Sequence, residues 1–332
     1  MDCPQDGDWM LSVYVPQGST LERIVVQPGA TPPENAVWID MVTPSVQEDR
    51  TVEQLIGIAV PTREEMQEIE VSSRLYVENG ARYMTATLMC QSDTVTPKTT
   101  AVTFILAGHR LVTVRYDDPR PFAIVEHKLG RSCHAKITGE DVLMDLLDAV
   151  IDRSADILER IGAEVDQVSH SIFEPEQEAQ QPSYNDVLKA LGRKGDLTSK
   201  VRESQVSVGR LLLFLANEAD NMKWPKDRRA QLQSMLRDVG SLSDHATYLT
   251  NKITFLLDAM LGVVNIQQNN IIKIFSVAAV VLMPPTLVAS IYGMNFRHMP
   301  ELDWIGGYPF ALLLMLLAAA LPYLYFKWRK WL

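Results

Sequence analysis

The pattern of apolar and polar positions predicts a mixed α/β domain over residues 1–138. Helical patterns at residues 47–60 and 63–71 are interspersed with β-rich segments, which cover residues 9–15, 21–26, 36–42, 74–90 and 101–116. The last two segments are predicted hairpins, and the first of these turns at Asn79-Gly80, the strongest two-residue hairpin signal. Neighbouring hairpins give a largely antiparallel sheet, so the fold class expected for the chain is α+β.

From Gly139 onward the apolar residues recur at helical spacing. Residues 139–225 are predicted to form a helical region that is interrupted by the proline- and glutamine-rich stretch 174–183. A third helix begins at Lys226, and its apolar residues alternate steps of three and four at Leu232, Met235, Val239, Leu242, Ala246, Leu249, Ile253, Leu256, Met260 and Val263. Such a heptad seam packs along its length against other helices. Residues 226–294 are therefore predicted to form one stalk helix, about 100 Å long, that continues into the first membrane span. An ordinary helical hairpin with a buried seam is the alternative.

Two apolar runs near the end of the chain, residues 274–294 and 308–326, carry no charge. Each is long enough as a helix to cross the roughly 30 Å hydrocarbon core of a bilayer. The polar stretch 295–307 joins them, and the basic tail 327–332 follows the second run directly. Because basic residues favour the cytosolic side, we expect a multi-pass protein of the cell (inner) membrane, with both termini in the cytosol and an extracytoplasmic loop. A buried helical hairpin is the alternative.

Charge is distributed unevenly between these parts. Of the 41 acidic and 31 basic residues, 39 acidic and 26 basic residues lie in residues 1–270, which gives that part a net charge of −13. Such a surface argues against nucleic acid as a partner and suits the attraction of cations. The cysteines, Cys3, Cys90 and Cys133, form no CxxC pair and indicate reduced thiols in a cytosolic domain. No GxGxxG, Walker A or GxSxG motif is present, so we expect neither an enzyme nor an organic cofactor.

A short signature follows the first apolar run. It reads Gly293-Met294-Asn295, and the outer stretch contains Met-Pro-Glu-Leu at 299–302. At the end of the first of two C-terminal spans, ahead of a basic tail, this combination resembles the CorA family of magnesium channels. The motifs cover residues 283–332, and the α/β domain and stalk helix agree with the family over the rest. Two spans cannot enclose an aqueous path. The resemblance implies a funnel-shaped homopentamer, whose partners are copies of the same chain, the lipid bilayer and divalent cations.

The resemblance also implies roles for particular residues. The first span lines the pore, and Gly293, Met294 and Asn295 form the selectivity filter. Because magnesium sheds its water reluctantly, a ring of Asn295 carboxamide oxygens can accept hydrogen bonds from the hydrated ion. In the outer loop, Glu301 raises the local cation concentration. The implied pore-lining positions alternate polar stations and apolar constrictions, and they are Asn269, Phe275, Ala279, Met283 and Thr286.

Two further features concern gating. Pro284 is followed by Pro285, where the family pattern has a proline and then an apolar residue, and this pair predicts a bend or loosening of the helix. Closure by cytosolic magnesium is a family expectation, and the matching positions are Asp258 on the stalk and Asp93 of the adjacent chain. Solvated surface carboxylates are the alternative for both. Magnesium is thus expected as the transported ion and as a regulatory ligand.

The predicted function is a divalent metal cation channel or transporter that takes up magnesium down its electrochemical gradient, with cobalt or nickel as side substrates. A zinc transporter of the same superfamily is one alternative. Zinc favours nitrogen and sulfur ligands, but the implied pore line has no Cys or His, and His298 in the loop is the only candidate. A non-conducting membrane-anchored sensor or scaffold is the other alternative, and it leaves the Gly-Met-Asn signature unexplained.

Overall fold

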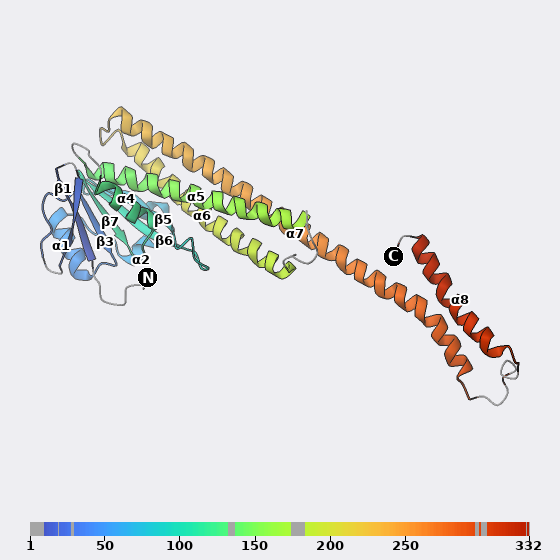
Figure 1. Ribbon diagram of the computed structural model, residues 1–332. Coiled ribbons are helices and arrows are strands. Elements are labelled where there is room, and N and C mark those ends of the chain that lie inside the picture. Colours follow the sequence, from blue (N-terminus) through green and yellow to red (C-terminus); the bar gives the residue numbers. More distant parts are fainter. Residues whose placement is uncertain are drawn as a thin grey trace. The chain divides into compact units, whose positions relative to one another are not determined.

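The structure is a computed structural model that describes residues 10–18, 20–27, 30–131, 137–173, 183–295, 299, 304–329 and 331 (Figure 1). The chain divides into two compact units, Met1–Phe255 and Leu256–Leu332, termed the N-terminal unit and the C-terminal unit. Helix α7 (Lys226–Tyr292) is continuous across the boundary between them. The sheet belongs to the N-terminal unit, whereas the implied ion path belongs to the C-terminal unit.

The N-terminal unit is organised around one seven-stranded sheet. Its strands are β1 (Met10–Gln17), β2 (Thr20–Val26), β3 (Trp38–Val42), β4 (Leu75–Glu78), β5 (Ala81–Cys90), β6 (Lys98–Ala107) and β7 (Arg110–Arg115). They lie in the order β2-β1-β3-β7-β6-β5-β4. Every neighbouring pair is antiparallel except β3 and β7, which are parallel. The prediction of a mixed domain with a largely antiparallel sheet is confirmed.

Both predicted hairpins are present. In the first, Glu78 pairs with Ala81 across Asn79 and Gly80, whose φ angles are +50° and +79°. Two successive positive φ angles match the right-handed twist of the strands, which is why an Asn-Gly turn suits a two-residue hairpin loop. The second hairpin joins β6 to β7, and Gly108 in its turn also has a positive φ, of +59°.

Helices cover the two faces of this sheet. On one face lie α1 (Val46–Ile56) and α2 (Arg63–Met66), and on the other lie α4 (Arg120–Leu129), α5 (Gly139–Phe173) and α6 (Tyr184–Glu218) (Figure 1). A single turn of helix without a buried residue, α3 (Val71–Arg74), leads directly into β4. The single helix expected over residues 63–71 is wrong. A capping box between Thr62 and Glu65 starts α2, but only Met66 is buried there. With no apolar stripe to bury, the helix ends after one turn.

The larger core lies between the sheet and the helices α4, α5, α6 and α7. Trp38, Phe104 and Phe122 are almost fully buried in it, and Tyr14 stacks on Trp38 with ring centroids 4.1 Å apart. The indole N–H of Trp38 donates to the hydroxyl of Thr113 at 2.9 Å, so the one polar atom of this side chain is satisfied. Burial of each such aromatic side chain stabilises the fold by roughly 2–3 kcal/mol.

A buried ion pair joins the two parallel strands. The carboxylate of Asp40 on β3 accepts from Nη2 of Arg115 on β7 at 2.9 Å and from its Nε at 3.2 Å. It also accepts from the hydroxyl of Thr113 at 2.7 Å. Nη1 of Arg115 reaches the exposed Asp118 at 2.6 Å. Because a buried charge requires compensation from hydrogen bonds and an opposite charge, these contacts act as one network.

Helix α7 buries most of its predicted seam. Leu232, Met235 and Val239 belong to the larger core, and Ala246, Leu249 and Ile253 further along the helix are also buried. Gly209 on α6 permits close packing here, because an added Cβ would lie 3.4 Å from Val239. The seam is thus a helix-packing surface in this unit. The break predicted at residues 174–183 lies almost wholly outside the described residues.

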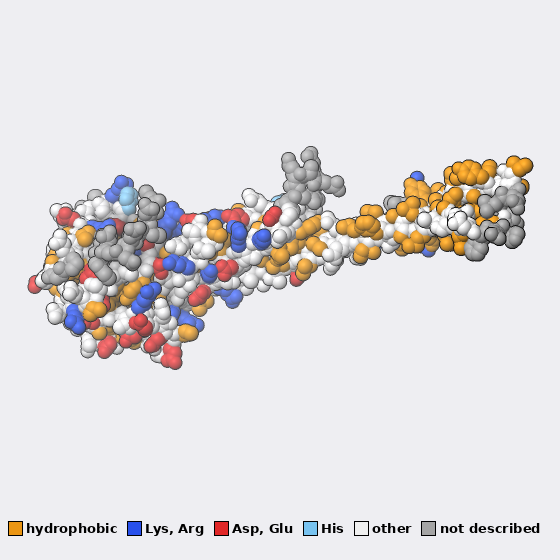
Figure 2. Space-filling model, turned by 90° about the horizontal axis from the view of Figure 1, so that it is seen from below, with side chains coloured by type: hydrophobic (Ala, Val, Ile, Leu, Met, Phe, Trp, Pro, Cys, Tyr) orange, Lys and Arg blue, Asp and Glu red, His pale blue; other side chains and the backbone are white. Residues whose placement is uncertain are grey.

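The C-terminal unit contains the rest of α7 and the helix α8 (Gly307–Trp328). Each helix has an 18-residue window with a mean hydropathy of 2.1 or 2.0, and only 6% of either window is buried. Figure 2 shows the contrast: hydrophobic side chains dominate the surface of this unit, whereas charged side chains are interspersed over the N-terminal unit. Helices this apolar and this exposed are candidate membrane spans, not the core of a soluble domain.

Candidate functional site

The Gly-Met-Asn signature lies where α7 ends. The last helical residue is Tyr292, and the amide of Gly293 still donates to the carbonyl of Ala289 at 3.0 Å. A Cβ on Gly293 would lie 3.1 Å from that carbonyl oxygen, which is closer than ordinary contact. Glycine therefore lets the helix terminate tightly, and the chain leaves it directly before Asn295.

Asn295 is exposed, and the structure gives its carboxamide no hydrogen bond within the described part of the chain. A carboxamide offers one acceptor oxygen and two N–H donors. Such a group at a helix terminus can accept hydrogen bonds from water around a cation. Met294 beside it is also 48% exposed.

The implied pore-lining residues share one side of α7. At 100° per residue, the five positions from Asn269 to Thr286 fall within an arc of about 120° and a rise of about 25 Å. Phe275 and Met283 are 71% and 67% exposed, although both side chains are apolar. Asn269 and Thr286 are exposed as well, and Ala279 is half-buried. Within the described part of the chain, this face of α7 is therefore largely exposed.

The two prolines lie inside the helix without ending it. Residues 281–292 remain α-helical through Pro284 and Pro285. Because neither proline has an N–H, the carbonyls of Val280 and Val281 lose their usual donors four residues on. The hydroxyl of Thr286 donates to the carbonyl of Leu282 one turn earlier, so its oxygen keeps its lone pairs for water.

A run of carboxamide side chains precedes the first candidate span. Of this run, the sequence identified only Asn269 as a candidate site residue. The run consists of Asn265, Gln267, Gln268, Asn269 and Asn270, all of which are exposed. Five amides within six residues, shortly before the uncharged apolar run 274–294, form a polar segment that the sequence alone could have identified.

Beyond the signature, Glu301 and His298 lie outside the described residues. Apart from Met299, the described part of the loop resumes at Trp304, whose carbonyl accepts from the amide of Gly307 at the start of α8. A Cβ on Gly306 would lie 2.9 Å from the Trp304 ring, so glycine is needed for the ring to pack there. The ring also contacts Phe310.

Asp93, one of the two carboxylates expected to hold regulatory magnesium, is bound by three arginines of its own chain. It accepts from Arg120 at 3.0 Å, from Arg153 at 2.7 Å and from Arg160. The hydrogen bond from Arg160 and the charges of Arg153, Arg160 and Arg120 lower the pKa of this carboxyl against a smaller opposing effect of burial. A divalent cation at this carboxylate would meet three guanidinium groups, which opposes its binding.

Asp258, the other expected regulatory residue, has a different environment. It lies on α7 in the C-terminal unit, it is exposed, and no ion pair is found for it among the described residues. More generally, the described residues contain no group of three or more His, Cys, Asp or Glu side chains arranged to hold a metal ion.

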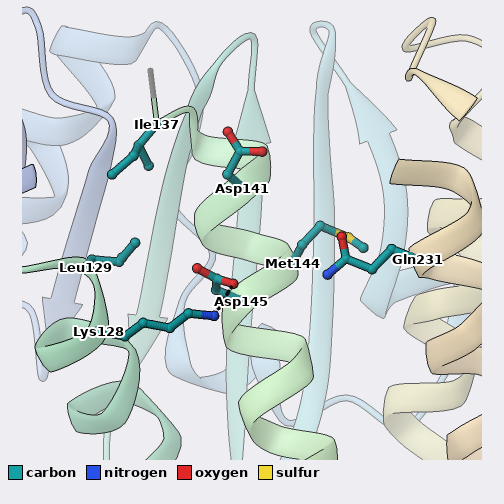
Figure 3. A pocket seen from close by; sticks show the side chains of 7 residues that line it. All are labelled: Lys128, Leu129, Ile137, Asp141, Met144, Asp145 and Gln231. Atoms are coloured by element: carbon teal, nitrogen blue, oxygen red, sulfur yellow. Dashed lines mark hydrogen bonds and ion pairs between the residues drawn. The ribbon is translucent and has the colours of Figure 1, made fainter. Parts of the chain in front are cut away.

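A small pocket of about 290 Å³ lies in the N-terminal unit between α4, α5 and α7 (Figure 3). Its acidic side chains are already paired. Asp145 accepts from Nζ of Lys128 at 2.7 Å, and Asp141 accepts from Arg228 at 2.5 Å and from the amide of Thr138 at 2.9 Å. Since these carboxylates are neutralised within the chain, the pocket is a poor cation site.

These features define a class of protein: an α+β chain with an N-terminal mixed-sheet unit, a long helix, and two C-terminal candidate membrane spans, of which the first ends in an exposed Gly-Met-Asn signature. A family profile described as "CorA-like Mg2+ transporter protein" matches residues 33–328. The chain belongs to this family. The prediction that it is a transporter of divalent cations and not an enzyme is thereby confirmed.

Curated relatives agree over nearly the whole chain. The magnesium transport protein CorA of Escherichia coli strain K12 is 36% identical over 323 residues, which cover 97% of this chain and 100% of the relative. The protein of the same name from Haemophilus ducreyi is 36% identical over 298 residues, covering 90% of this chain and 92% of the relative.

Solved structures agree with the fold. The CorA magnesium transporter from Methanocaldococcus jannaschii matches with a TM-score of 0.74 at 17% identity, over 99% of this chain and 100% of that one. The cytoplasmic domain of ZntB from Vibrio parahaemolyticus matches with a TM-score of 0.57 at 9% identity, over 77% of this chain and 98% of that one. At these identities the likeness shows the fold alone.

Proposed function

We propose that this chain forms a homopentameric channel that passes magnesium into the cell down its electrochemical gradient. The observation that carries the proposal is the exposed Asn295 at the end of a candidate span, on a chain 36% identical to magnesium transport proteins over 97% of its length. Cobalt and nickel, which resemble magnesium in charge, are the expected side substrates. The chain lies in the cell membrane, with both termini in the cytosol.

Selection occurs at the outer mouth. Gly293 ends the helix tightly, so that Asn295 of each copy is presented beside the axis. Magnesium keeps its first water shell more firmly than other common cations. The ring of carboxamides accepts hydrogen bonds from those waters, which holds the ion too weakly to trap it. Glu301 in the outer loop adds negative charge that concentrates cations near this mouth.

The path then follows the exposed arc of α7. Thr286 and Asn269 provide polar stations, because their oxygens can accept from water around the ion. Between them, Met283, Ala279 and Phe275 narrow the path with apolar surface. Such constrictions exclude water, and hence ions, until the helices move apart.

We further propose that cytosolic magnesium closes the channel at a site on the stalk that includes Asp258. Its exposure and its lack of an ion pair among the described residues leave this carboxylate open to a cation. Asp93 was the expected partner from the adjacent chain, but three arginines already neutralise it. Of the two carboxylates, Asp258 is therefore the better candidate ligand.

A zinc transporter of the same superfamily is the second candidate function, because the fold of the N-terminal unit is shared with the cytoplasmic domain of ZntB and does not by itself discriminate between the two ions. Zinc sites use Cys and His ligands, and none of the proposed pore positions is Cys or His. A non-conducting scaffold, the third candidate, gives no role to an exposed carboxamide at the end of a span.

Flux into liposomes tests the proposal. Purified chain is reconstituted, and uptake of magnesium, zinc and cobalt is measured for the native protein and for Asn295→Ala. We expect the variant to lose magnesium uptake, or its preference for magnesium, by about tenfold or more, because several hydrogen bonds to the hydrated ion are removed and each 1.4 kcal/mol corresponds to a factor of ten.

Asn270→Ala is the matched control, since Asn270 is an exposed amide on the same helix but lies outside the pore-facing arc. It should conduct like the native protein. Equal, unselective uptake by the native chain and Asn295→Ala would remove Asn295 from the filter. A reconstituted protein that conducts as a monomer would refute the shared pore.

A further inference from the structure

A groove of about 660 Å³ opens on the N-terminal unit between α6, β5 and the first part of α7. It adjoins a second hollow of about 390 Å³, because Arg74, Thr87 and Glu203 line both. Sites for small organic ligands commonly have volumes of about 300–1,000 Å³. The groove is thus large enough for a ligand, and it lies apart from the proposed ion path in the C-terminal unit.

Three guanidinium groups line this groove against one carboxylate. Arg202 and Arg210 come from one face of α6, and Arg74 comes from the end of α3. The described residues provide no ion pair for Arg202 or Arg210. Among the described residues that line the groove, Glu203 is the one acid. These positive side chains lie in a part of the chain that is strongly acidic as a whole.

Arg74 is held in place by the protein. Its Nε donates to the carbonyl of Glu68 at 2.5 Å, and its Nη1 donates to the hydroxyl of Thr87 at 3.1 Å. These two bonds fix the guanidinium plane, whereas no hydrogen bond within the described residues uses Nη2. Thr87 is anchored in turn, since its amide donates to the hydroxyl of Ser207 at 2.9 Å. A fixed guanidinium is a preorganised donor for an anion.

The guanidinium group of Arg74 is also partly desolvated. Burial is the largest effect and lowers its pKa, Glu203 raises it by a smaller amount, and Arg210 lowers it by less than Glu203 raises it. Desolvation disfavours the charged form of a side chain. An anion bound in the groove would therefore give this guanidinium group a counter-charge in addition to that of Glu203.

The walls of the groove also include apolar surface. Ile69 is 88% exposed and Val206 is 42% exposed, and both line it. A single inorganic phosphate would leave most of the volume empty and would not contact these side chains. We propose that this groove binds an organic polyphosphate of nucleotide size, with its phosphates on Arg74, Arg202 and Arg210 and its organic part against Ile69 and Val206.

Isothermal titration of ATP into the purified full-length chain in detergent tests the proposal. EDTA is present, so that the result does not depend on binding of divalent cations. We expect saturable binding by the native chain, and about tenfold weaker binding by Arg202→Gln and by Arg210→Gln, because each loses charge-assisted hydrogen bonds to phosphate. Both residues are exposed, so these substitutions leave the fold intact.

The matched control is Arg193→Gln, an exposed arginine of the same helix that does not line the groove. It should bind ATP like the native chain, and pyrophosphate should bind the native chain more weakly than ATP. No saturable binding of ATP would overturn the proposal. Equal affinity of the native chain and both groove variants would overturn it as well, and so would equal affinity for pyrophosphate and ATP.

Discussion

The buried pair between Asp40 and Arg115 provides a direct test of what holds the N-terminal unit together. The side chains of Asp40 and Arg115 are only 4% and 10% exposed. Asp40→Ala removes the carboxylate that accepts from Nε and Nη2 of Arg115 and from the hydroxyl of Thr113. The guanidinium group then stays buried, and it keeps its hydrogen bonds through Nη1 and its contact with the ring of Phe122.

Removal of one partner from a buried ion pair costs about 3–5 kcal/mol, because the remaining charge is desolvated without compensation. For a domain of this size, 1 kcal/mol corresponds to a change in melting temperature of about 2–4 °C. We therefore expect Asp40→Ala to lower the melting temperature by about 6–20 °C. The measurement is thermal unfolding of the purified chain in detergent, followed by tryptophan fluorescence, to which Trp38 beside Thr113 contributes.

Asp118→Ala is the matched control. Asp118 also pairs with Arg115, at 2.6 Å, but its side chain is 76% exposed. Exposed ion pairs contribute up to about 1 kcal/mol to stability, so the melting temperature of this variant should fall by less than about 4 °C. Equal shifts for Asp40→Ala and Asp118→Ala would show that burial of the pair does not set its contribution, and the reasoning would fail.

Two other predictions concern the same unit. Burial, and after it the charges of Glu53 and Glu48, raise the pKa of Asp49 from 3.8 to about 6. The folded state therefore binds a proton more tightly than the unfolded state, and stability falls as pH rises from about 4 to about 6. Asp49→Asn should melt a few degrees higher than the native chain at pH 7.5 but not at pH 4. Gly139→Ala would place a Cβ 2.5 Å from the backbone nitrogen of Leu111. Thermal melting should therefore show that the free energy of unfolding falls by at least about 2 kcal/mol. Gly192→Ala is the control: the space around Gly192 is open, so this variant should be as stable as the native chain or more stable.

Local signals predicted the local structure well. The Asn79-Gly80 turn, the helical periodicity after Gly139 and the two uncharged runs each depend on residues close together in the sequence, and each is present. Helix α4 was missed because Arg120-Pro121 follows two aspartates and a proline and is typical of a loop. Pro121 in fact lies in the first turn of the helix, where a missing N–H does no harm.

Contacts between distant residues could not be predicted in this way. The three arginines around Asp93 come from positions 27, 60 and 67 residues away. The parallel pairing of β3 with β7 is likewise a crossover that no local pattern encodes. For the same reason the sequence identified Asp93 as an acid that could bind a cation, but it could not show that the site is already neutralised.

The arrangement of polar positions on α7 bears on how many copies form the pore. At 100° per residue, Asn269 and Thr286 are separated by about 100° around the helix axis. In a closed ring of equal helices, the sector of each helix that faces the axis spans about 60° for three copies, about 90° for four and about 110° for five. A ring of three or four would turn at least one of these polar side chains against a neighbouring helix, where it would lose contact with water. A ring of three or four copies is therefore too small for both polar stations to face the ion path, whereas a larger ring such as the proposed pentamer leaves room for both.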